Sequence, residues 1–485
     1  MKIHKITDLY WELARILIEK LNYNSIDYCH WKSNLNVGKA MAGFDDLDLL
    51  INRNDFNRCQ IILSELGFKE ASNSIQHIHS IRHYYGLDQA TGEILHVHLY
   101  VSLLTGPSWT KGYSFPIEKE YLSSSFLDKE LKIRLPQRDY ELALFLIRIC
   151  LKFSCAVELP FVIVAREEIN QEIEFLLKDS SIANASKIFN RLTCASSDDL
   201  FLNVIDTKVG LPRLVITAIR VRLKLGHLRT LSLLEQLRKS LWQLCYRVIN
   251  KLFLKRKKNF SNGGILISFV GLDASGKSSM LHESDKWLSK RFNVRKLHFG
   301  RPMCCVITFL PNLFIKLNKK IKGKKRLSNN YDDNGKKSLI YIVRNLILAY
   351  DRYRVILKGR KWSRKGYVVL VDRYKSENIG VMDSPKLDPK GLRSFKGYLA
   401  KLENNLYHRM GSVDLILHLR VPLDVAIKRN NERSKSDKET TSELTLRYEV
   451  NRDLVYRAKK YHVIDTSETY NHVLSRIKSL IWESL

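Results

Sequence analysis

The sequence predicts an α/β protein with two α/β domains, residues 1–135 and 261–485, joined by a helical, basic connector of residues 136–260. Three observations lead to this prediction. Continuous apolar runs alternate with helical patterns in the C-terminal part, as in a doubly wound parallel sheet. Short strand and helix patterns are mixed in the N-terminal part. The middle part is mostly helical and has few glycines and prolines.

The composition of the 485 residues fits a globular protein with more than one core. Hydrophobic residues make up 45% of the chain and charged residues 27%, which excludes the disordered and fibrous classes. The formal net charge of +31 favours anionic partners, such as nucleic acid, anionic lipid or phosphorylated glycan. The basic stretches are rich in Leu and Ile and poor in aromatic residues, which disfavours nucleic acid.

The cysteines and the apolar segments indicate a protein of the reducing cytosol. The eight cysteines include no C-x-x-C pair, so their spacing predicts neither a zinc site nor a disulfide framework. No stretch reaches the roughly 20 uninterrupted apolar residues of a membrane span, and the N-terminus lacks the apolar region of a signal peptide. We expect a cytoplasmic protein, with peripheral contact at the inner face of the membrane left open.

The first domain carries a pair of acidic residues on a predicted strand. Residues 11–21 have the apolar spacing of a helix, and residues 46–51 and 94–104 have strand patterns. Asp46 and Asp48 are two residues apart, so on a strand their carboxylates share one face and can converge on one metal ion.

This pair resembles the D-x-D strand of the nucleotidyltransferase superfamily, which binds Mg²⁺ beneath a triphosphate. The resemblance covers about residues 20–110 and implies that Lys32 and Ser33 belong to the segment that contacts phosphate. A third carboxylate is expected on a neighbouring strand, but the best candidate strand carries His96 and His98. A transferase with altered metal ligation, a degenerate nucleotide- or substrate-binding domain, and a plain acidic loop with core histidines all stay open.

Two basic amphipathic segments allow two interpretations each. Residues 208–258 have apolar residues at helical spacing with Arg and Lys between them, which suits a helix packed on its own domain or one lying on an anionic membrane. The packed interpretation is favoured for most of this segment. Residues 303–336 interrupt the C-terminal domain as a basic insertion, for which the membrane or a lipid substrate is about equally favoured.

A phosphate-binding motif follows the first of four apolar runs in the C-terminal domain. Residues 271–278 fit G-x-x-x-x-G-K-[ST] between a predicted strand and a helix. Lys277 should reach the β and γ phosphate oxygens, and the Ser278 hydroxyl should bind Mg²⁺. The predicted nucleotide-binding residues are Gly271, Asp273, Ala274, Ser275, Gly276, Lys277, Ser278 and Ser279.

Later motifs supply further charged residues. Asp372 ends a predicted buried strand, where it can hold Mg²⁺ through water, and Arg373 beside it can face phosphate. Residues 427–437 form a basic segment that can close over ATP, with Arg429 and Arg433 neutralising charge on the transferred phosphoryl group.

Together these motifs resemble the thymidylate kinase family over about 200 residues. The matching segments are "GLDASGKSS", the helical Asp351-Arg352 pair, the strand that ends in Asp372-Arg373-Tyr374, "DLILHLRVPLDVAIKRNNER" and "YHVIDTS". The resemblance implies a P-loop kinase fold, ATP and Mg²⁺ as cofactors, and Asp273 near the acceptor, and it leaves a dimer open. Lys277, Asp273, Arg373, Arg429 and Arg433 are the predicted catalytic residues.

The acceptor half departs from the family. "HFGRP" retains only Arg301 and Pro302 of the family's Arg-Glu-Pro-Gly-Gly segment, and "KSENIG" replaces its Tyr-Gln-Gly stretch. A nucleoside monophosphate, thymidylate first, would use Arg301, Arg352 and Arg373. A sugar or lipid-linked glycan intermediate of surface polysaccharide synthesis would need a general base, with Asp273 the best candidate and Asp372 the second.

Two further function classes stay open at this point. One is a nucleic-acid end-processing or defence protein that combines a kinase with a nucleotidyltransferase. The other is a non-catalytic scaffold that nucleotide binding controls.

Overall fold

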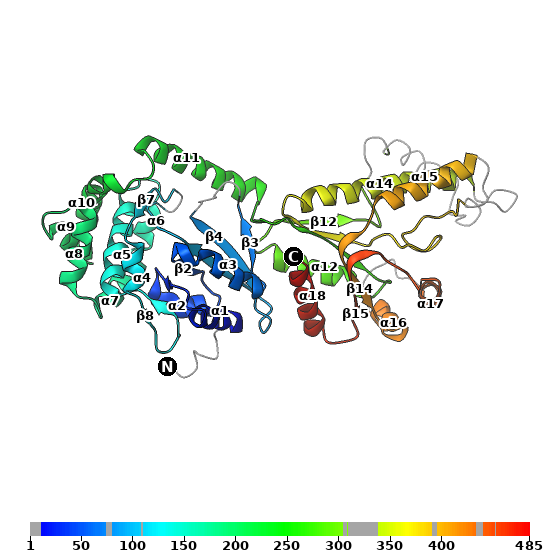
Figure 1. Cartoon of the computed structure of the whole chain (residues 1–485). Helices are drawn as coiled ribbons and strands as arrows, with labels where there is room; N and C mark the ends of the chain where they lie inside the picture. Colours follow the sequence, from blue (N-terminus) through cyan, green and yellow to red (C-terminus); the bar gives the residue numbers. More distant parts are fainter. Residues whose placement is uncertain are drawn as a thin grey trace. The chain divides into compact units, whose positions relative to one another are not determined.

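The computed structural model describes residues 11–73, 80–107, 110–303, 308, 338–389, 395–432, 440–451 and 453–485. The chain divides into two compact units, unit 1 (Met1–Arg256) and unit 2 (Lys257–Leu485) (Figure 1). This division differs from the predicted three domains, because residues 136–256 belong to the same unit as the N-terminal sheet. The reason is a shared core, in which Tyr100 and Phe115 pack with Leu146 and Phe189 from the helices of the predicted connector.

Unit 1 contains a mixed sheet with the strand order β1-β2-β5-β4-β3. β2 runs parallel to β5, while the pairs β1–β2, β4–β5 and β3–β4 are antiparallel. The predicted strand 46–51 is present as β2 and lies beside β5, but the predicted strand 94–104 is divided, because β5 ends at Tyr100 and residues 103–105 form β6 of a separate small sheet. The strands are β1 (Tyr28–His30), β2 (Leu47–Ile51), β3 (Lys69–Ser72), β4 (Ile81–Leu87) and β5 (Ile94–Tyr100), with the small pairs β6 (Leu103–Thr105) and β7 (Tyr113–Phe115), and β8 (Phe126–Leu127) and β9 (Arg134–Leu135).

Helices make up most of the rest of unit 1. They are α1 (Glu12–Tyr23), α2 (Val37–Met41), α3 (Phe56–Glu65), α4 (Glu118–Ser123), α5 (Arg138–Phe153), α6 (Leu159–Val164), α7 (Arg166–Leu177), α8 (Ile182–Thr193), α9 (Asp199–Ile205), α10 (Leu211–Lys224) and α11 (Leu233–Ile249). α5 is buried on nearly every side because it is the central helix of the core, where Leu142, Leu146 and Leu151 are fully buried. None of the described helices combines the length and the apolar character needed to cross a membrane.

The two helices of the basic segment 208–258 differ in packing. α10 buries Leu214, Ala218 and Val221 against unit 1, as the packed interpretation predicts. In contrast, α11 leaves Leu234 81% exposed and Trp242 66% exposed, so its apolar face is uncovered among the described residues. The packed interpretation therefore does not describe α11.

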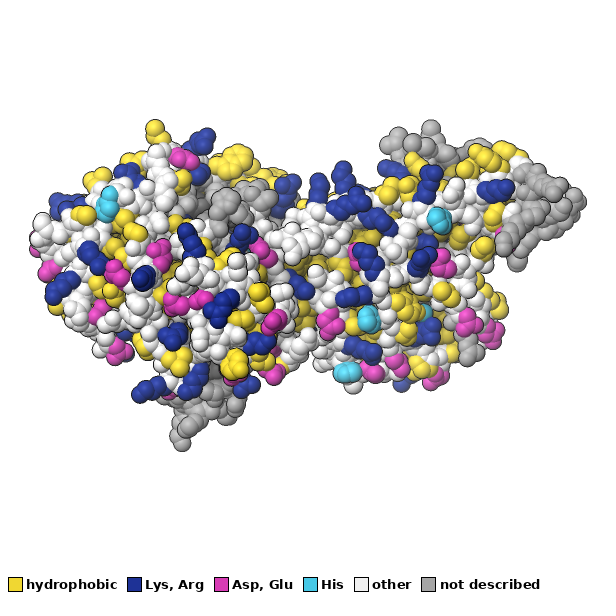
Figure 2. Space-filling model, in the orientation of Figure 1, with side chains coloured by type: hydrophobic (Ala, Val, Ile, Leu, Met, Phe, Trp, Pro, Cys, Tyr) yellow, Lys and Arg dark blue, Asp and Glu magenta, His cyan; other side chains and the backbone are white. Residues whose placement is uncertain are grey.

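Figure 2 shows lysine and arginine side chains distributed over the visible face of each unit.

Unit 2 is a doubly wound α/β unit, as predicted. Its sheet has the order β12-β13-β11-β14-β15, and every neighbouring pair is parallel. α14 and α15 lie on one face of this sheet and α12 and α18 on the other (Figure 1). The strands are β10 (Asn259–Phe260), β11 (Ile265–Val270), β12 (Val294–His298), β13 (Val368–Asp372), β14 (Val413–Arg420) and β15 (Ala458–Asp465). The helices are α12 (Lys277–Leu288), α14 (Leu339–Ser363), α15 (Phe395–Arg409), α16 (Leu423–Asn431), α17 (Thr441–Val450) and α18 (Tyr470–Ser484).

The central strand of this sheet determines where ligands can bind. All six residues of β11 are buried because strands flank it on both sides and helices cover both faces. The chain continues from β11 to β12 and β13 on one side of it and then to β14 and β15 on the other. Such a reversal opens a crevice beyond the carboxyl ends of the strands, and the phosphate-binding motif begins at that end of β11.

Every cysteine that the structure describes has a free thiol. Cys304, Cys305 and most of the basic insertion lie outside the described residues.

Candidate functional site

The loop between β11 and α12 has positive φ at Gly271, Ala274 and Gly276. Gly271 has φ +144°, and a Cβ there would lie 2.2 Å from the Leu419 carbonyl oxygen of β14. Gly276 has φ +82° and directly precedes α12, which begins at Lys277. The N-terminal amides of α12 therefore follow the loop, in the arrangement that binds phosphate groups.

Lys277 lies against this loop. Its Nζ donates a hydrogen bond to the Leu272 carbonyl oxygen at 2.6 Å, and the side chain is largely buried. Ser278 and Ser279, the next residues of α12, are exposed. The ammonium group is thus held beside the glycine-rich loop, while the Ser278 hydroxyl remains accessible to a ligand.

The Asp372-Arg373 motif lies beside the phosphate loop because of the register of β11 and β13. Asp372 at the end of β13 pairs with Phe269 of β11, so the two strands end side by side. Arg373 follows with φ +72°, and its Nη2 lies 3.2 Å from Asp273 Oδ1. Asp372 Oδ2 lies 3.7 Å from His298 Nε2. The predicted Asp-Arg pair therefore lies at the same edge of the sheet as the phosphate loop.

Asp273 lies between two arginines. Its Oδ1 faces Arg373, and its Oδ2 is 2.7 Å from Arg447 Nη1 of α17. Tyr448 donates from its hydroxyl to the Asp273 carbonyl oxygen at 3.3 Å. Burial alone would raise the pKa of Asp273, but the charges of Arg373, Lys277 and Arg447 outweigh it and lower the pKa. The carboxylate is therefore ionised at neutral pH.

The lowered pKa of Asp273 predicts a pH-dependent contribution to stability. A carboxyl group whose pKa is lower in the folded state stabilises the protein above its unfolded pKa of about 3.9, and this stabilisation is lost as the pH falls through the folded value. The difference in free energy of unfolding between wild type and Asp273→Asn should be constant above about pH 5 and should change below about pH 4. Denaturant titrations of wild type and Asp273→Asn, carried out at pH values above and below this transition, measure the difference in free energy of unfolding. Asp453→Asn, which removes an exposed carboxylate, is the control; an equal pH dependence in both variants would contradict the prediction.

Arg352 is buried and its guanidinium has three partners. It donates to Asp383 Oδ1 at 2.6 Å, to the Tyr407 hydroxyl at 2.6 Å and to the Phe299 carbonyl oxygen at 3.2 Å. Asp383 also lies 3.5 Å from Arg373 Nη1, so one carboxylate joins the two arginines. An acceptor phosphate at Arg352 would therefore have to compete with Asp383.

Arg429 of α16 approaches the loop from the side of β15. It donates to the Thr466 carbonyl oxygen at 2.5 Å and to the Thr466 hydroxyl at 3.3 Å. The Thr466 hydroxyl in turn lies 3.2 Å from the Ser275 carbonyl oxygen. A cavity of about 290 Å³ opens here, lined by Gly276, Ser279, Arg429 and Thr466 among others. Arg433, the other predicted lid residue, lies outside the described residues.

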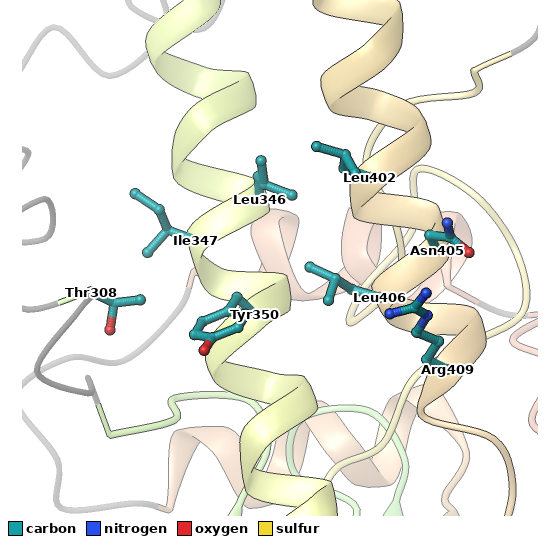
Figure 3. Close-up of a pocket in the computed structure, with 8 residues that line it drawn as sticks. All are labelled: Thr308, Leu346, Ile347, Tyr350, Leu402, Asn405, Leu406 and Arg409. Carbon is teal, nitrogen blue, oxygen red and sulfur yellow. The ribbon is translucent and has the colours of Figure 1, made fainter.

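A separate cavity of about 410 Å³ lies between α14 and α15 (Figure 3). Its lining is mostly apolar, and the close-up shows Leu346 of α14 facing Leu402 and Leu406 of α15, while Ile347 points toward Thr308. The lining residues are Thr308, Leu346, Ile347, Tyr350, Leu402, Asn405, Leu406 and Arg409. Among the described residues, none of the phosphate loop lines this cavity.

The two acidic residues of unit 1 lie close together, Asp48 on β2 and Asp46 directly before this strand. Asp46 and Asp48 both lie beside His98, whose Nε2 is 3.6 Å from Asp46 Oδ2 and whose Nδ1 is 3.0 Å from Asp48 Oδ1. Lys32 Nζ forms an ion pair with Asp48 Oδ2 at 2.9 Å. Burial would raise the pKa of Asp48, but Lys32 and then His98 hold it well below its ordinary value. Both carboxylates therefore contact basic side chains in this structure.

Of the predicted site residues, the phosphate loop, Asp372, Arg373 and Arg429 are thus brought to one edge of unit 2. The Arg301 side chain is exposed, and its backbone N–H donates to His298 Nδ1 at 3.3 Å.

Several residues of this edge were not predicted. Arg447 and Tyr448 come from a helix whose start carries a capping box, Thr440 with Glu443, which is a readable helix signal but no indication of a site. Asp383 carries no motif of its own, and Thr466 lies in the matching segment "YHVIDTS" but was not predicted as a site residue. In unit 1, Lys111 was also missed: its Nζ lies 3.2 Å from the Tyr100 hydroxyl, and burial together with Lys32 lowers its pKa to about 7.

Comparisons with known proteins find similarity to thymidylate kinases. No family model matches the chain. The thymidylate kinase of Thermosipho melanesiensis is 27% identical over 222 residues, which are 45% of this chain and 97% of that protein. The solved thymidylate kinase of Ehrlichia chaffeensis is 17% identical, with a TM-score of 0.25, over 45% of this chain and 98% of its own. The solved thymidylate kinase of Candida albicans is 16% identical, with a TM-score of 0.26, over 46% of this chain and 90% of its own. The 27% identity to the Thermosipho melanesiensis protein confirms the predicted resemblance to thymidylate kinases for about 45% of the chain.

Proposed function

We propose that unit 2 is an ATP-dependent nucleotide kinase. The observation that carries the proposal is the contact between Arg373 and Asp273, which joins the Asp-Arg-Tyr motif to the phosphate loop at the carboxyl edge of the sheet. A loop for the phosphates of ATP and a basic group for the transferred phosphoryl group are thus side by side. The similarity to a thymidylate kinase supports the same reaction class.

The donor side follows from the loop. In this structure, the Lys277 ammonium donates to the Leu272 carbonyl oxygen. When ATP binds at this loop, Lys277 would donate to the β and γ phosphate oxygens instead, because these oxygens are also hydrogen-bond acceptors. The Ser278 hydroxyl and the Asp372 carboxylate are hard oxygen donors, which fit Mg²⁺ directly or through water. Mg²⁺ bound there would neutralise charge on the β and γ phosphates. Arg429 lies beside the loop, next to the Ser275 carbonyl, where it can contact ATP.

The acceptor side favours a phosphate as nucleophile. A hydroxyl acceptor needs a base to take its proton, but the lowered pKa makes Asp273 a weak base. A monophosphate is already anionic and needs only positive charge, which Arg373 and Arg447 provide on either side of Asp273. In the transfer, an acceptor phosphate oxygen bonds to the γ phosphorus while the bond to the β–γ bridging oxygen breaks and ADP leaves. We therefore propose a nucleoside monophosphate, thymidylate first.

The test is a product assay on the purified full-length chain with ATP and Mg²⁺. Thymidylate should yield thymidine diphosphate and ADP, whereas thymidine, which lacks the phosphate, should yield no phosphorylated product. Transfer to a sugar phosphate or a lipid-linked sugar, with none to nucleoside monophosphates, would overturn the acceptor but not the kinase. ATP binding without ADP formation for any acceptor would overturn the kinase and favour a scaffold.

Peripheral contact with an anionic membrane, a dimer and a working transferase in unit 1 stay predictions.

A further inference from the structure

Three histidines gather on one face of the sheet of unit 1. His83 lies on β4, and His96 and His98 lie on β5. The antiparallel register places His83 directly opposite His98, and the alternation along β5 puts His96 on the same face. The parallel register with β2 places Asp48 opposite His98 on the other side. Three adjacent strands therefore direct imidazoles and carboxylates to one position.

The ring nitrogens are close enough to share one ion. One nitrogen from each of the three rings lies within 4.8 Å of the others. His83 Nδ1 and His96 Nε2 are 3.2 Å apart. Two nitrogens bound to one tetrahedral Zn²⁺ at about 2.0–2.1 Å lie about 3.3 Å apart, so this separation already matches a metal site. A hydrogen bond between two rings would account for that distance, but not for a third imidazole nitrogen converging on the same place.

Carboxylates orient two of the rings. His96 Nδ1 lies 2.6 Å from Asp46 Oδ1, and His98 Nδ1 lies 3.0 Å from Asp48 Oδ1. If each Nδ1–H donates to its carboxylate, both rings present Nε2 to the centre of the cluster. Metal-binding histidines are held in this way, because the carboxylate fixes the tautomer and raises the basicity of the ligand nitrogen. His96 is also buried and stacks on Tyr85, with ring centroids 4.3 Å apart.

We propose that His83, His96 and His98 bind a divalent transition-metal ion, with Zn²⁺ the best fit. Imidazole nitrogens favour Zn²⁺ and its neighbours, whereas Mg²⁺ takes oxygen ligands. Three nitrogens leave a fourth tetrahedral position for water or for Asp46, whose Oδ2 is 3.6 Å from His98 Nε2. The site is independent of the kinase proposed for unit 2, and it differs in donor type from the Mg²⁺ site predicted for Asp46 and Asp48.

The test uses Zn²⁺ alone on the full-length chain, purified without a polyhistidine tag and freed of metal by a chelator. Competition with a chromophoric chelator should show one equivalent of tightly bound Zn²⁺. Asp48→Asn should weaken the affinity by about 10-fold, and His83→Phe, which loses a ligand but keeps a ring in a half-buried position, by about 100-fold or more. His408→Phe, at an exposed position in unit 2, is the matched control and should bind like wild type.

Co²⁺ provides a second readout that does not depend on variants. A tetrahedral site gives intense visible absorption with Co²⁺, and excess Mg²⁺ should not remove it. Weak, octahedral-type absorption, or Zn²⁺ binding to wild type no tighter than to folded His83→Phe, would overturn the proposal. His96 and His98 would then serve only as hydrogen-bond partners of Asp46 and Asp48. Circular dichroism establishes that each variant is folded, and if His83→Phe is not, the Co²⁺ spectrum of wild type decides.

Discussion

Replacing Lys277 with alanine is expected to lower ATP-dependent phosphoryl transfer by about 100- to 1,000-fold, the loss that follows removal of one preorganised charged or hydrogen-bonding group. The ammonium group is placed beside the loop by its bond to the Leu272 carbonyl and by burial against unit 2. Charge accumulates on the γ phosphoryl group and the leaving ADP during transfer, so a fixed cation stabilises the transition state more than the ground state. The loss should therefore fall mainly on kcat.

Lys286→Ala is the matched control for this experiment. Lys286 lies on the same helix, α12, but is exposed in its last turn. It should retain wild-type activity and bind ATP normally. The measurement is initial-rate formation of ADP and diphosphate product from ATP and thymidylate, with thermal unfolding of each variant recorded alongside. Lys277→Ala that turns over at a rate near wild type while remaining folded would contradict the assignment of the loop as the ATP site.

Replacing Arg352 with methionine is expected to destabilise unit 2 by about 3 kcal/mol, because it leaves a buried charge with its main partner removed. Asp383 is 7% exposed and would retain only the longer contact to Arg373. The Tyr407 hydroxyl and the Phe299 carbonyl would also lose a donor. Methionine keeps most of the apolar stem, so the cost arises from the lost guanidinium rather than from a cavity.

Native-state hydrogen exchange measures this effect within unit 2, since peptides of β11, β13 and α14 report on that unit alone. Arg354→Met, two residues away on an exposed face of α14, should change their protection little. The double variant Arg352→Met/Asp383→Asn should recover part of the loss, because it no longer buries an unpaired carboxylate. Equal protection in wild type and Arg352→Met would show that the ion pair is not a stabilising contact.

The central strands of unit 2 and the phosphate loop follow from local patterns in the sequence. The β11 and β13 strands are predicted from short, mostly apolar runs because both are buried on two faces, so Ser268 and the terminal Asp372 are their only polar residues. The phosphate loop is read from Gly271 and Gly276, since positive φ and the approach of the Leu419 carbonyl oxygen require glycine there. These constraints act within a few consecutive residues, so a short stretch of sequence is enough to predict the strands and the loop.

Other features depend on residues that are distant in the chain. Arg447 is 174 residues from Asp273, and Asp383 is 31 residues from Arg352, yet they form ion pairs. The sequence predicted a substrate-facing role for Arg352, but not that its guanidinium would be buried against three partners. The packing of α14 and α17 against the loops of unit 2 brings these arginines to their carboxylates. Nothing in the local sequence pattern identifies which arginine pairs with which carboxylate.

The sequence by itself determined that this chain carries a glycine-rich loop after a buried strand, and that Asp48 and the nearby Asp46 lie at a second strand, because backbone conformation and strand alternation are local properties. The tertiary structure alone decided what surrounds them. The order of the strands in unit 2 brought Arg373 to Asp273, and the register of β4, β5 and β2 brought three histidines to the two aspartates. Register and strand order are set by the packing of whole faces against the core, and electrostatic partners are selected only after that packing is fixed.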